Sequence, residues 1–109
     1  MKEVRQVNIY IGLNDAESHE QLFDTEKYVS ILKRVCKAYR VAFSMNRING
    51  GYFHEDGTYV EENSLVLTLL DVDDQIIEEI SKDLCVFFNQ ESVMVTYSKA
   101  SIQFVKESI

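Results

Sequence analysis

The sequence predicts an α+β fold in which two helices pack on one face of an antiparallel sheet. Several segments alternate apolar and polar residues as strands do, and two others repeat apolar residues at the three-and-four spacing of a helix. The chain has 109 residues, of which 46% are apolar, with four glycines and no proline. That composition is typical of a compact chain with one hydrophobic core, so we expect a single domain over residues 1–109.

The N-terminal part of the chain predicts a strand, a polar loop and a helix. Residues 7–13 place Val, Ile, Ile and Leu on one face, which indicates a half-buried strand. A polar loop follows over residues 14–21. Asp24 or Thr25 then supplies the N-cap of an amphipathic helix over residues 25–39.

The middle of the chain predicts two strands and a small hairpin. A strand begins near Val41 and reaches Gly50 and Gly51, where two adjacent glycines indicate a bulge or a bend. The Asp56-Gly57 pair, flanked by strand formers, predicts the turn of a small hairpin with short arms that projects from the sheet. The apolar run over residues 64–70 predicts a central strand.

The C-terminal part predicts a second helix and two short strands. The helix begins after three aspartates and ends near Asn89; its inward face consists of Ile76, Ile77, Ile80, Leu84, Phe87 and Phe88. Strands follow over residues 92–97 and 101–105, joined by a turn at residues 98–100. Two βαβ units with their helices on one side form a ferredoxin-like sandwich, here with an extra small hairpin.

Charge is distributed unevenly along the chain. The formal net charge is -7 and the isoelectric point is near 4.7, which argues against binding a polyanion. Six basic residues and no acidic one lie between Lys27 and His54, whereas nine acidic residues and no basic one lie between Ile48 and Ser81. Basic residues of the first helix could pair with acidic residues of the second, or the basic face of helix 25–39 could bind RNA.

Acidic side chains without nearby basic partners suggest a surface for binding another protein. The candidate partner-binding residues are Glu17, Glu20, Tyr52, Glu55, Asp56, Tyr59, Glu61 and Glu62. The carboxylates would meet a basic surface, such as that of an RNA-guided nuclease, and the two tyrosines would anchor the contact. The alternative is a solvated acidic surface that keeps the protein soluble.

No motif in the sequence indicates catalysis, a metal or a cofactor, so we expect a non-enzymatic protein. Cys36 and Cys85 are distant from each other and are predicted to be reduced, buried thiols. His54, Glu55 and Asp56 would point to alternate sides of a strand and therefore do not form a metal site. An alternative is a homodimeric small-molecule-binding or oxygenase-like protein, with His54 facing a cavity that is lined by Tyr10, Phe43, Met45 and Met94.

Neither end of the sequence nor its interior predicts a membrane attachment. No apolar run approaches the length of a membrane span, and the first residues lead into a strand pattern without an apolar signal core. We therefore expect a cytoplasmic protein.

Several motifs suggest a family resemblance. They are Ile9-Tyr10-Ile11-Gly12-Leu13, the stretch from Gly51 to Gly57, Ser64-Leu65-Val66-Leu67, Phe88-Asn89-Gln90-Glu91-Ser92-Val93 and Phe104. On these motifs the chain resembles a family of small bacterial proteins of unknown function. The resemblance implies a ferredoxin-like fold and a structural role for Glu91, and brings no activity. Asn14-Asp15 stands where members carry Arg-Pro. In general character the chain also resembles phage inhibitors of host nucleases, anti-CRISPR proteins among them.

Overall fold

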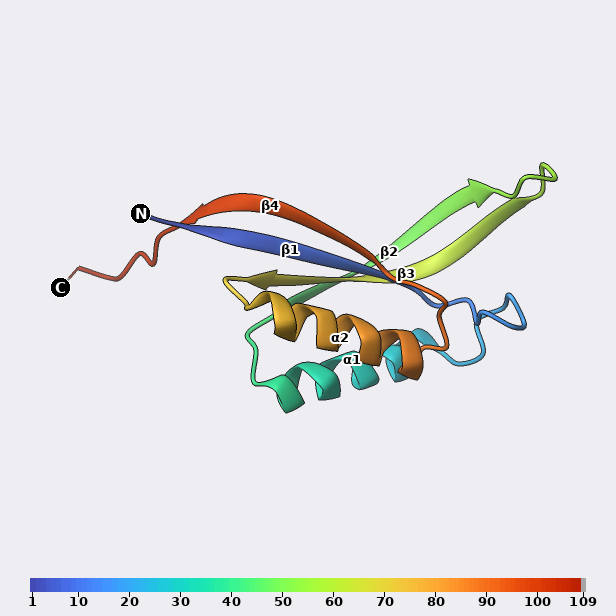
Figure 1. Ribbon diagram of the computed structural model, residues 1–109, viewed down its shortest axis with the longest axis horizontal. Helices are drawn as coiled ribbons and strands as arrows, with labels where there is room; N and C mark the ends of the chain where they lie inside the picture. Colours follow the sequence, from blue (N-terminus) through green and yellow to red (C-terminus); the bar gives the residue numbers. More distant parts are fainter. Residues whose placement is uncertain (109) are drawn as a thin grey trace.

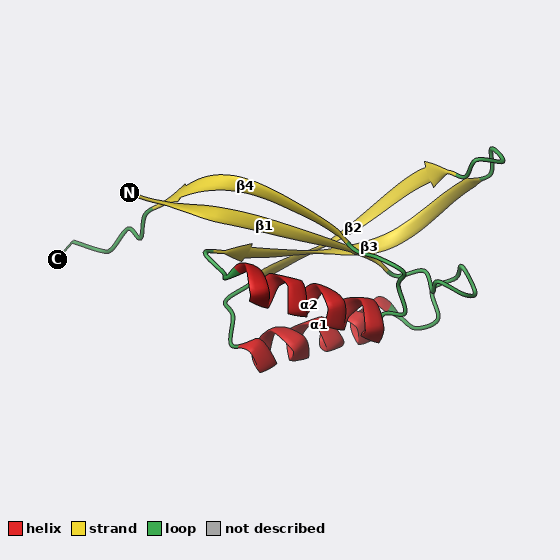
Figure 2. Cartoon of the chain, in the orientation of Figure 1, coloured by secondary structure: helices red, strands yellow, loops and turns green. Residues whose placement is uncertain are grey.

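The structure, a computed structural model, describes residues 1–108. Its elements are β1 (Lys2–Gly12), α1 (Thr25–Tyr39), β2 (Ser44–Phe53), β3 (Tyr59–Leu70), α2 (Asp74–Phe87) and β4 (Met94–Ile102). The strands form one antiparallel sheet in the order β2-β3-β1-β4. Both helices lie on the same face of this sheet (Figures 1 and 2). The predicted ferredoxin-like sandwich is confirmed.

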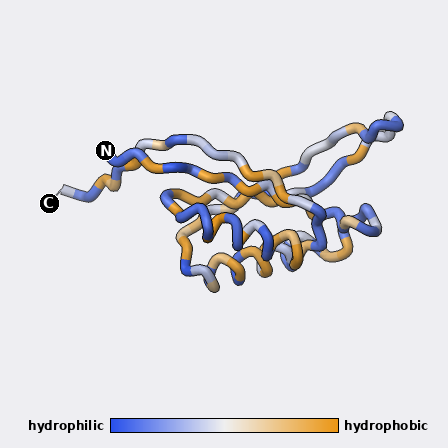
Figure 3. The backbone as a smooth tube through the Cα atoms, viewed as in Figure 1, coloured by the Kyte–Doolittle hydropathy of each residue, from blue (hydrophilic) through white to orange (hydrophobic). Residues whose placement is uncertain are grey.

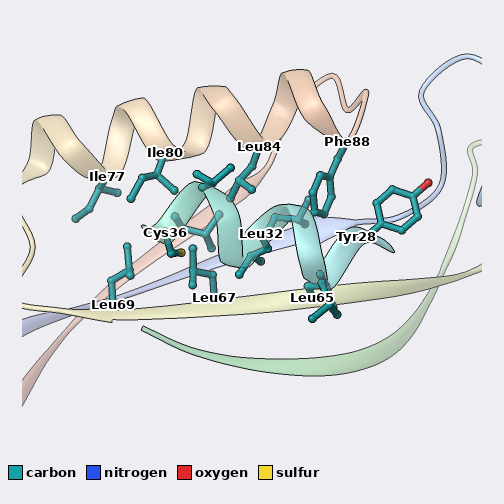
Figure 4. Close-up of a cluster of buried hydrophobic side chains, with 14 of the residues drawn as sticks. Tyr28, Leu32, Cys36, Leu65, Leu67, Leu69, Ile77, Ile80, Leu84 and Phe88 are labelled. Atoms are coloured by element: carbon teal, nitrogen blue, oxygen red, sulfur yellow. The ribbon is translucent and has the colours of Figure 1, made fainter. Parts of the chain in front are cut away.

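The core lies between the helices and the two central strands. Val7, Ile9, Ile11 and Leu13 all face the helices and are at most 1% exposed, as the alternation predicted. Leu32 and Cys36 of α1 and Ile77, Ile80 and Leu84 of α2 pack against Leu65, Leu67 and Leu69 of β3 (Figure 4). Burial of these side chains supplies the main stabilising free energy of the fold.

Both helices lie where their sequences indicate, and α1 has the predicted side-chain cap, whereas Asp73 at the start of α2 makes no capping hydrogen bond through its side chain. Asp24 is the N-cap of α1 and accepts a hydrogen bond from the Lys27 amide. Arg40 ends α1 in the left-handed conformation, and Asn89 does the same after α2. Phe87 is the exception to the predicted inward face: its side chain is 57% exposed. It lies about 100° around the helix from the buried Phe88 and falls outside the inward stripe.

The predicted small hairpin is the outer part of one long β2–β3 hairpin. Its turn is at Asp56-Gly57 as expected, with a positive φ of 87° at Gly57. The arms are not short, because pairing is continuous from Ser44–Thr68 to Phe53–Tyr59. No bulge forms at the two glycines; instead, the Tyr59 side chain occupies the space that a side chain at Gly51 would fill. The tip of the hairpin is hydrophilic (Figure 3).

The prediction of two short C-terminal strands is wrong. β4 is continuous, and residues 98–100, the predicted turn, pair with Gln6, Arg5 and Val4 of β1. β1 begins at Lys2, earlier than predicted, because its polar first half is supported by pairing with β4 and not by core packing. The chain leaves the sheet after Ile102, so residues 103–105 are not a strand.

The helices are linked by a hydrogen bond, not by the ion pairs that charge alone suggested. The Tyr39 hydroxyl donates to Asp83 over 2.6 Å, and this bond raises the pKa of Tyr39 to about 12. Within residues 1–108, none of the ion pairs joins α1 to α2. The basic side chains Lys33, Arg34 and Lys37 of α1 remain exposed.

In the described chain, no helix is long and apolar enough to cross a membrane.

Leu32 and Leu22 offer a matched test of where stability resides. Leu32 is fully buried in the core, whereas Leu22 is 53% exposed. Leu32→Ala is expected to lower the free energy of unfolding by about 2 to 5 kcal/mol, because it leaves a cavity. Leu22→Ala is expected to lower it by less than about 1 kcal/mol. Urea denaturation measures both, and equal losses would contradict this placement of the core.

Candidate functional site

A notch of about 340 Å³ lies where β1 ends, between the outer part of the β2–β3 hairpin, next to its turn, and the residues that precede β4. Three segments line it: residues 14–19, the hairpin residues Tyr52, His54, Val60 and Glu62, and residues 90–92. The notch is open to solvent and not an enclosed cavity. It is therefore accessible to a ligand that approaches from the hairpin end of the sheet.

The loop that forms one wall of the notch is held by the buried carboxylate of Asp15. Its Oδ1 accepts from the Asn89 side chain at 2.7 Å, and its Oδ2 accepts from the amides of Glu17 and Ser18 at 3.0 and 3.1 Å. The Ala16 amide also donates to the Asn89 carbonyl. These bonds, that of Asn89 foremost, lower the pKa of Asp15. Asp15 is therefore a structural residue that ties this loop to the end of α2.

Glu62 is the carboxylate that points into the notch. Its Oε2 accepts a hydrogen bond from the Asn14 amide at 3.0 Å, and the Asn14 carbonyl accepts one from the Gln90 side chain at 2.6 Å. The carboxylate lies directly over Gly12, in the space that any side chain there would occupy. Among residues 1–108, no donor contacts the other oxygen, Oε1, so it is free to accept a hydrogen bond from a ligand.

The notch combines negative charge with aromatic surface. Its lining contains three carboxylates, those of Asp15, Glu62 and Glu91, and no Lys or Arg. Tyr52 is 48% exposed and packs edge-on against His54, with ring centroids 5.4 Å apart. This combination suits a cation, which gains both from the carboxylates and from the face of an aromatic ring.

The side chains that line the notch do not indicate a metal site. Within residues 1–108, no three His, Cys, Asp or Glu side chains converge closely enough to hold a metal ion. Asp15 already uses both oxygens within the protein, and the two histidines lie on different walls of the notch. The carboxylates can thus attract and orient an organic cation.

The predicted partner-binding residues do not form one surface. Because neighbours along a strand point to opposite sides, Tyr52 and Glu62 face the notch, whereas Tyr59 and Glu61 face the other side of the hairpin. The Tyr59 hydroxyl donates to Glu61 over 3.2 Å, and its ring packs on Phe53.

The remaining acidic residues of that predicted surface are spread over two loops. Glu55 and Asp56 form the hairpin turn, where the Asp56 carboxylate accepts from the Thr58 amide. Glu17 and Glu20 lie exposed on the loop that follows β1.

The predicted cavity lined by Tyr10, Phe43, Met45 and Met94 is wrong. Phe43 and Met45 pack against the core, and Tyr10 and Met94 lie on the face of the sheet away from the helices. His54 does line the notch, as that alternative required. Cys36 is buried, as predicted, and burial raises the pKa of its thiol to about 11.

The sequence singled out Tyr52, His54 and Glu62, which line the notch, but not Asp15, Asn14 and Gln90, which hold its walls in place. Asp15 carried a usable signal, because an aspartate followed by polar residues often accepts hydrogen bonds from amides two and three positions later. No local pattern in the sequence indicates the contact between Gly12 and Glu62, because the two residues are fifty positions apart.

Comparisons with known proteins reveal similarity of structure but not of sequence. No family model matches the chain, and no curated protein matches its sequence. A phage SAM lyase in complex with S-methyl-5'-thioadenosine is similar in structure, with a TM-score of 0.66 and 22% identity over 87% of this chain and 80% of the lyase. GlnK of B. subtilis, in complex with ATP, has a TM-score of 0.58 and 10% identity over 90% of this chain and 82% of GlnK.

A third structure extends the same pattern. CutA of Synechococcus elongatus has a TM-score of 0.58 and 11% identity over 93% of this chain and 82% of CutA. At these identities the likeness establishes the ferredoxin-like fold alone. Membership of the family of unknown function stays a prediction.

The Asp15 carboxylate predicts a pH dependence of stability. Its pKa in the folded protein is lowered, so its contribution to stability is present above the unfolded pKa of about 4 and is lost as pH falls through the folded value. Asp15→Asn is expected to be less stable at pH 7 and to lose less stability on acidification. Urea denaturation from pH 7 to pH 2 measures both, and parallel curves for the two proteins would contradict the role of Asp15.

Proposed function

We propose that this chain binds S-adenosylmethionine in the notch. The observation that carries the proposal is the combination of a preorganised carboxylate, Glu62, with the exposed ring of Tyr52 in a pocket whose lining contains no Lys or Arg. S-adenosylmethionine carries a sulfonium, an ammonium and a carboxylate, and its net charge of about +1 and its two cationic groups suit such a pocket. The volume of the notch, about 340 Å³, lies within the range of small-molecule sites.

The charge of the notch favours this ligand over ATP. Two of the similar structures are complexes with adenosine compounds, S-methyl-5'-thioadenosine for the phage SAM lyase and ATP for GlnK. Three carboxylates in the lining would repel a triphosphate, whereas they would stabilise a sulfonium. The negative charge of the notch therefore favours S-adenosylmethionine, whose sulfur is cationic, over ATP.

Cleavage of the bound molecule is the activity that this likeness supports. A lyase that forms S-methyl-5'-thioadenosine breaks the bond between the sulfonium sulfur and the amino-acid side chain. The sulfur leaves with the bonding electron pair as a neutral thioether, while a carboxylate oxygen of the substrate itself forms the new bond to the carbon and closes a lactone. The oxidation states balance within the substrate, so the reaction needs no redox cofactor. The task of Glu62 in such a reaction would be to hold and orient the substrate ammonium, for which its Oε1 is free.

Gly12→Ala tests the proposal through the position of the Glu62 carboxylate. A methyl group at residue 12 would displace that carboxylate, whereas one at Gly50, on the same face of the sheet, would meet open space. Gly12→Ala is expected to weaken binding of S-adenosylmethionine by about tenfold or more, and Gly50→Ala to leave it unchanged. Isothermal titration calorimetry measures both affinities, and release of S-methyl-5'-thioadenosine is followed by chromatography.

A neutral analogue separates charge from shape in the same experiment. S-adenosylhomocysteine lacks the sulfonium and is expected to bind the wild-type protein about tenfold more weakly. Absence of binding to the wild-type protein would overturn the proposal, as would equal effects of the two alanine substitutions. Binding of S-adenosylmethionine without release of S-methyl-5'-thioadenosine would support the binding site and contradict the lyase activity.

The outer part of the β2–β3 hairpin favours a second candidate function, the predicted acidic interaction protein. This hairpin projects from the body of the molecule (Figure 1) and exposes Phe53 and Tyr59 at 72% and 53% next to acidic residues. Exposed aromatic rings beside carboxylates suit contact with a basic protein surface. In this second function the chain would inhibit a nucleic-acid enzyme, such as an RNA-guided nuclease, in the predicted cytoplasmic location.

A pair of double charge reversals tests the hairpin function. Glu55→Lys with Glu61→Lys changes the hairpin, and Glu78→Lys with Glu79→Lys makes the same charge change on α2. Only the hairpin variant is expected to lose inhibition of DNA cleavage across a panel of purified RNA-guided nucleases. Equal loss in both variants, or no inhibition by the wild-type protein, would contradict this function.

A further inference from the structure

The face of the sheet away from the helices carries almost no charge. The strand pairings place alternate residues of Val4–Gly12, Ser44–Tyr52, Val60–Leu70 and Met94–Ile102 on this open face. On this face β1–β4 place two charged residues, Glu62 at the notch and Lys2 at the opposite end, where it pairs with Ile102, although 27% of all residues in the chain are charged. The charged residues of the same strands, such as Arg5, Arg47 and Lys99, point to the other side.

Apolar side chains on this open face remain exposed. Ile48, Leu70 and Met94 are 40%, 44% and 58% exposed, and Tyr52 is 48% exposed. Between them lie neutral polar residues such as Asn8, Thr68 and Thr96. A face exposed to water on a protein this acidic would be expected to carry charge, so its composition is typical of a surface that is covered.

The size of the molecule indicates how much surface is uncovered. Its accessible surface is 7666 Å², whereas a compact monomer of this mass exposes about 6,200 Å². Its radius of gyration is 15.9 Å, against about 13 Å for a compact domain of this length. The excess surface, on the order of 1,400 Å², belongs to the whole elongated molecule, whose extents are 58 × 29 × 28 Å and which includes the projecting hairpin (Figure 1). A standard protein interface buries roughly 800 Å² of each partner.

We propose that a second copy of this chain covers the open face of the sheet. With a net charge of -7, two copies repel each other through most of their surfaces, and the open face lets them meet without opposing like charges. A partner with a basic surface would be drawn to the acidic loops and hairpin instead. The open face offers such a partner one carboxylate at its end.

The second copy would also border the notch. Tyr52, Val60 and Glu62 belong both to the open face and to the lining of the notch. Covering the face would therefore narrow the open side of the notch and shield its carboxylate from water. This consequence rests on the proposed function, whereas the association of two copies does not.

Sedimentation equilibrium of the full chain without ligand tests the association alone. The wild-type protein is expected to form a dimer or a higher assembly. Thr96→Glu and Thr96→Lys place opposite charges at the same exposed position of the open face, and each is expected to weaken association by about 100-fold or more, because each buries an unpaired charge. Ser30→Glu, on the exposed side of α1, is the matched control and is expected to leave association unchanged.

The outcomes separate this proposal from others. Circular dichroism and thermal melting confirm that each variant folds. A monomeric wild-type protein overturns the proposal, and so does association that Ser30→Glu weakens as much as Thr96→Glu. If Thr96→Lys strengthens association while Thr96→Glu weakens it, net charge controls association and the open face is not the interface. Binding of S-adenosylmethionine, measured separately by calorimetry, can fail without changing any of these results.

Discussion

The carboxylate of Asp15 ties the end of β1 to the end of α2, and the notch depends on that junction. The Asp15 carboxylate accepts hydrogen bonds from the Asn89 side chain and from two amides of its own loop. These bonds fix the path of the chain after Leu13. The Asn14 amide is then aimed at Glu62, and the Asn14 carbonyl is held by Gln90. Local hydrogen bonds thus position a carboxylate that belongs to a distant strand.

The same junction explains why glycine stands at residue 12. The Glu62 carboxylate approaches the backbone of β1 so closely that no side chain fits beneath it. On the opposite side of the hairpin, the Tyr59 ring over Gly51 repeats this arrangement. In both places a missing side chain on one strand makes room for a functional or aromatic group from the next.

Much of the fold could be predicted from sequence because its core is built from periodic segments. Residues 25–39 form a helix with the predicted bounds, and Val7, Ile9, Ile11 and Leu13 are buried as their alternation indicates. The errors lie where pairing between strands, and not burial, determines structure. The polar residues Ser98 and Lys99 extend β4 because β1 supplies hydrogen-bond partners, which a local pattern does not reveal.

The candidate site was less predictable because its contacts join separate parts of the chain. The sequence indicated that Glu62 and Tyr52 lie near each other, yet it grouped them with Tyr59 and Glu61, which face the other way. The distribution of charge along the sequence indicated a basic segment and acidic segments but not which face of the sheet lacks charge. The strands separate a nearly uncharged sheet face from the charged helices and loops, so that cation binding and self-association use neighbouring surfaces.

Titration of the protein with S-adenosylmethionine, followed by amide chemical shifts, shows directly whether the notch is the binding site. If the notch is the site, the largest shifts will fall on Gly12, Asn14, Tyr52 and Gln90, with the Asn14 amide affected through its bond to Glu62. The hairpin turn at Asp56-Gly57 will stay unchanged. Shifts confined to the hairpin turn or to α1, or no shifts at saturating ligand, would contradict the account.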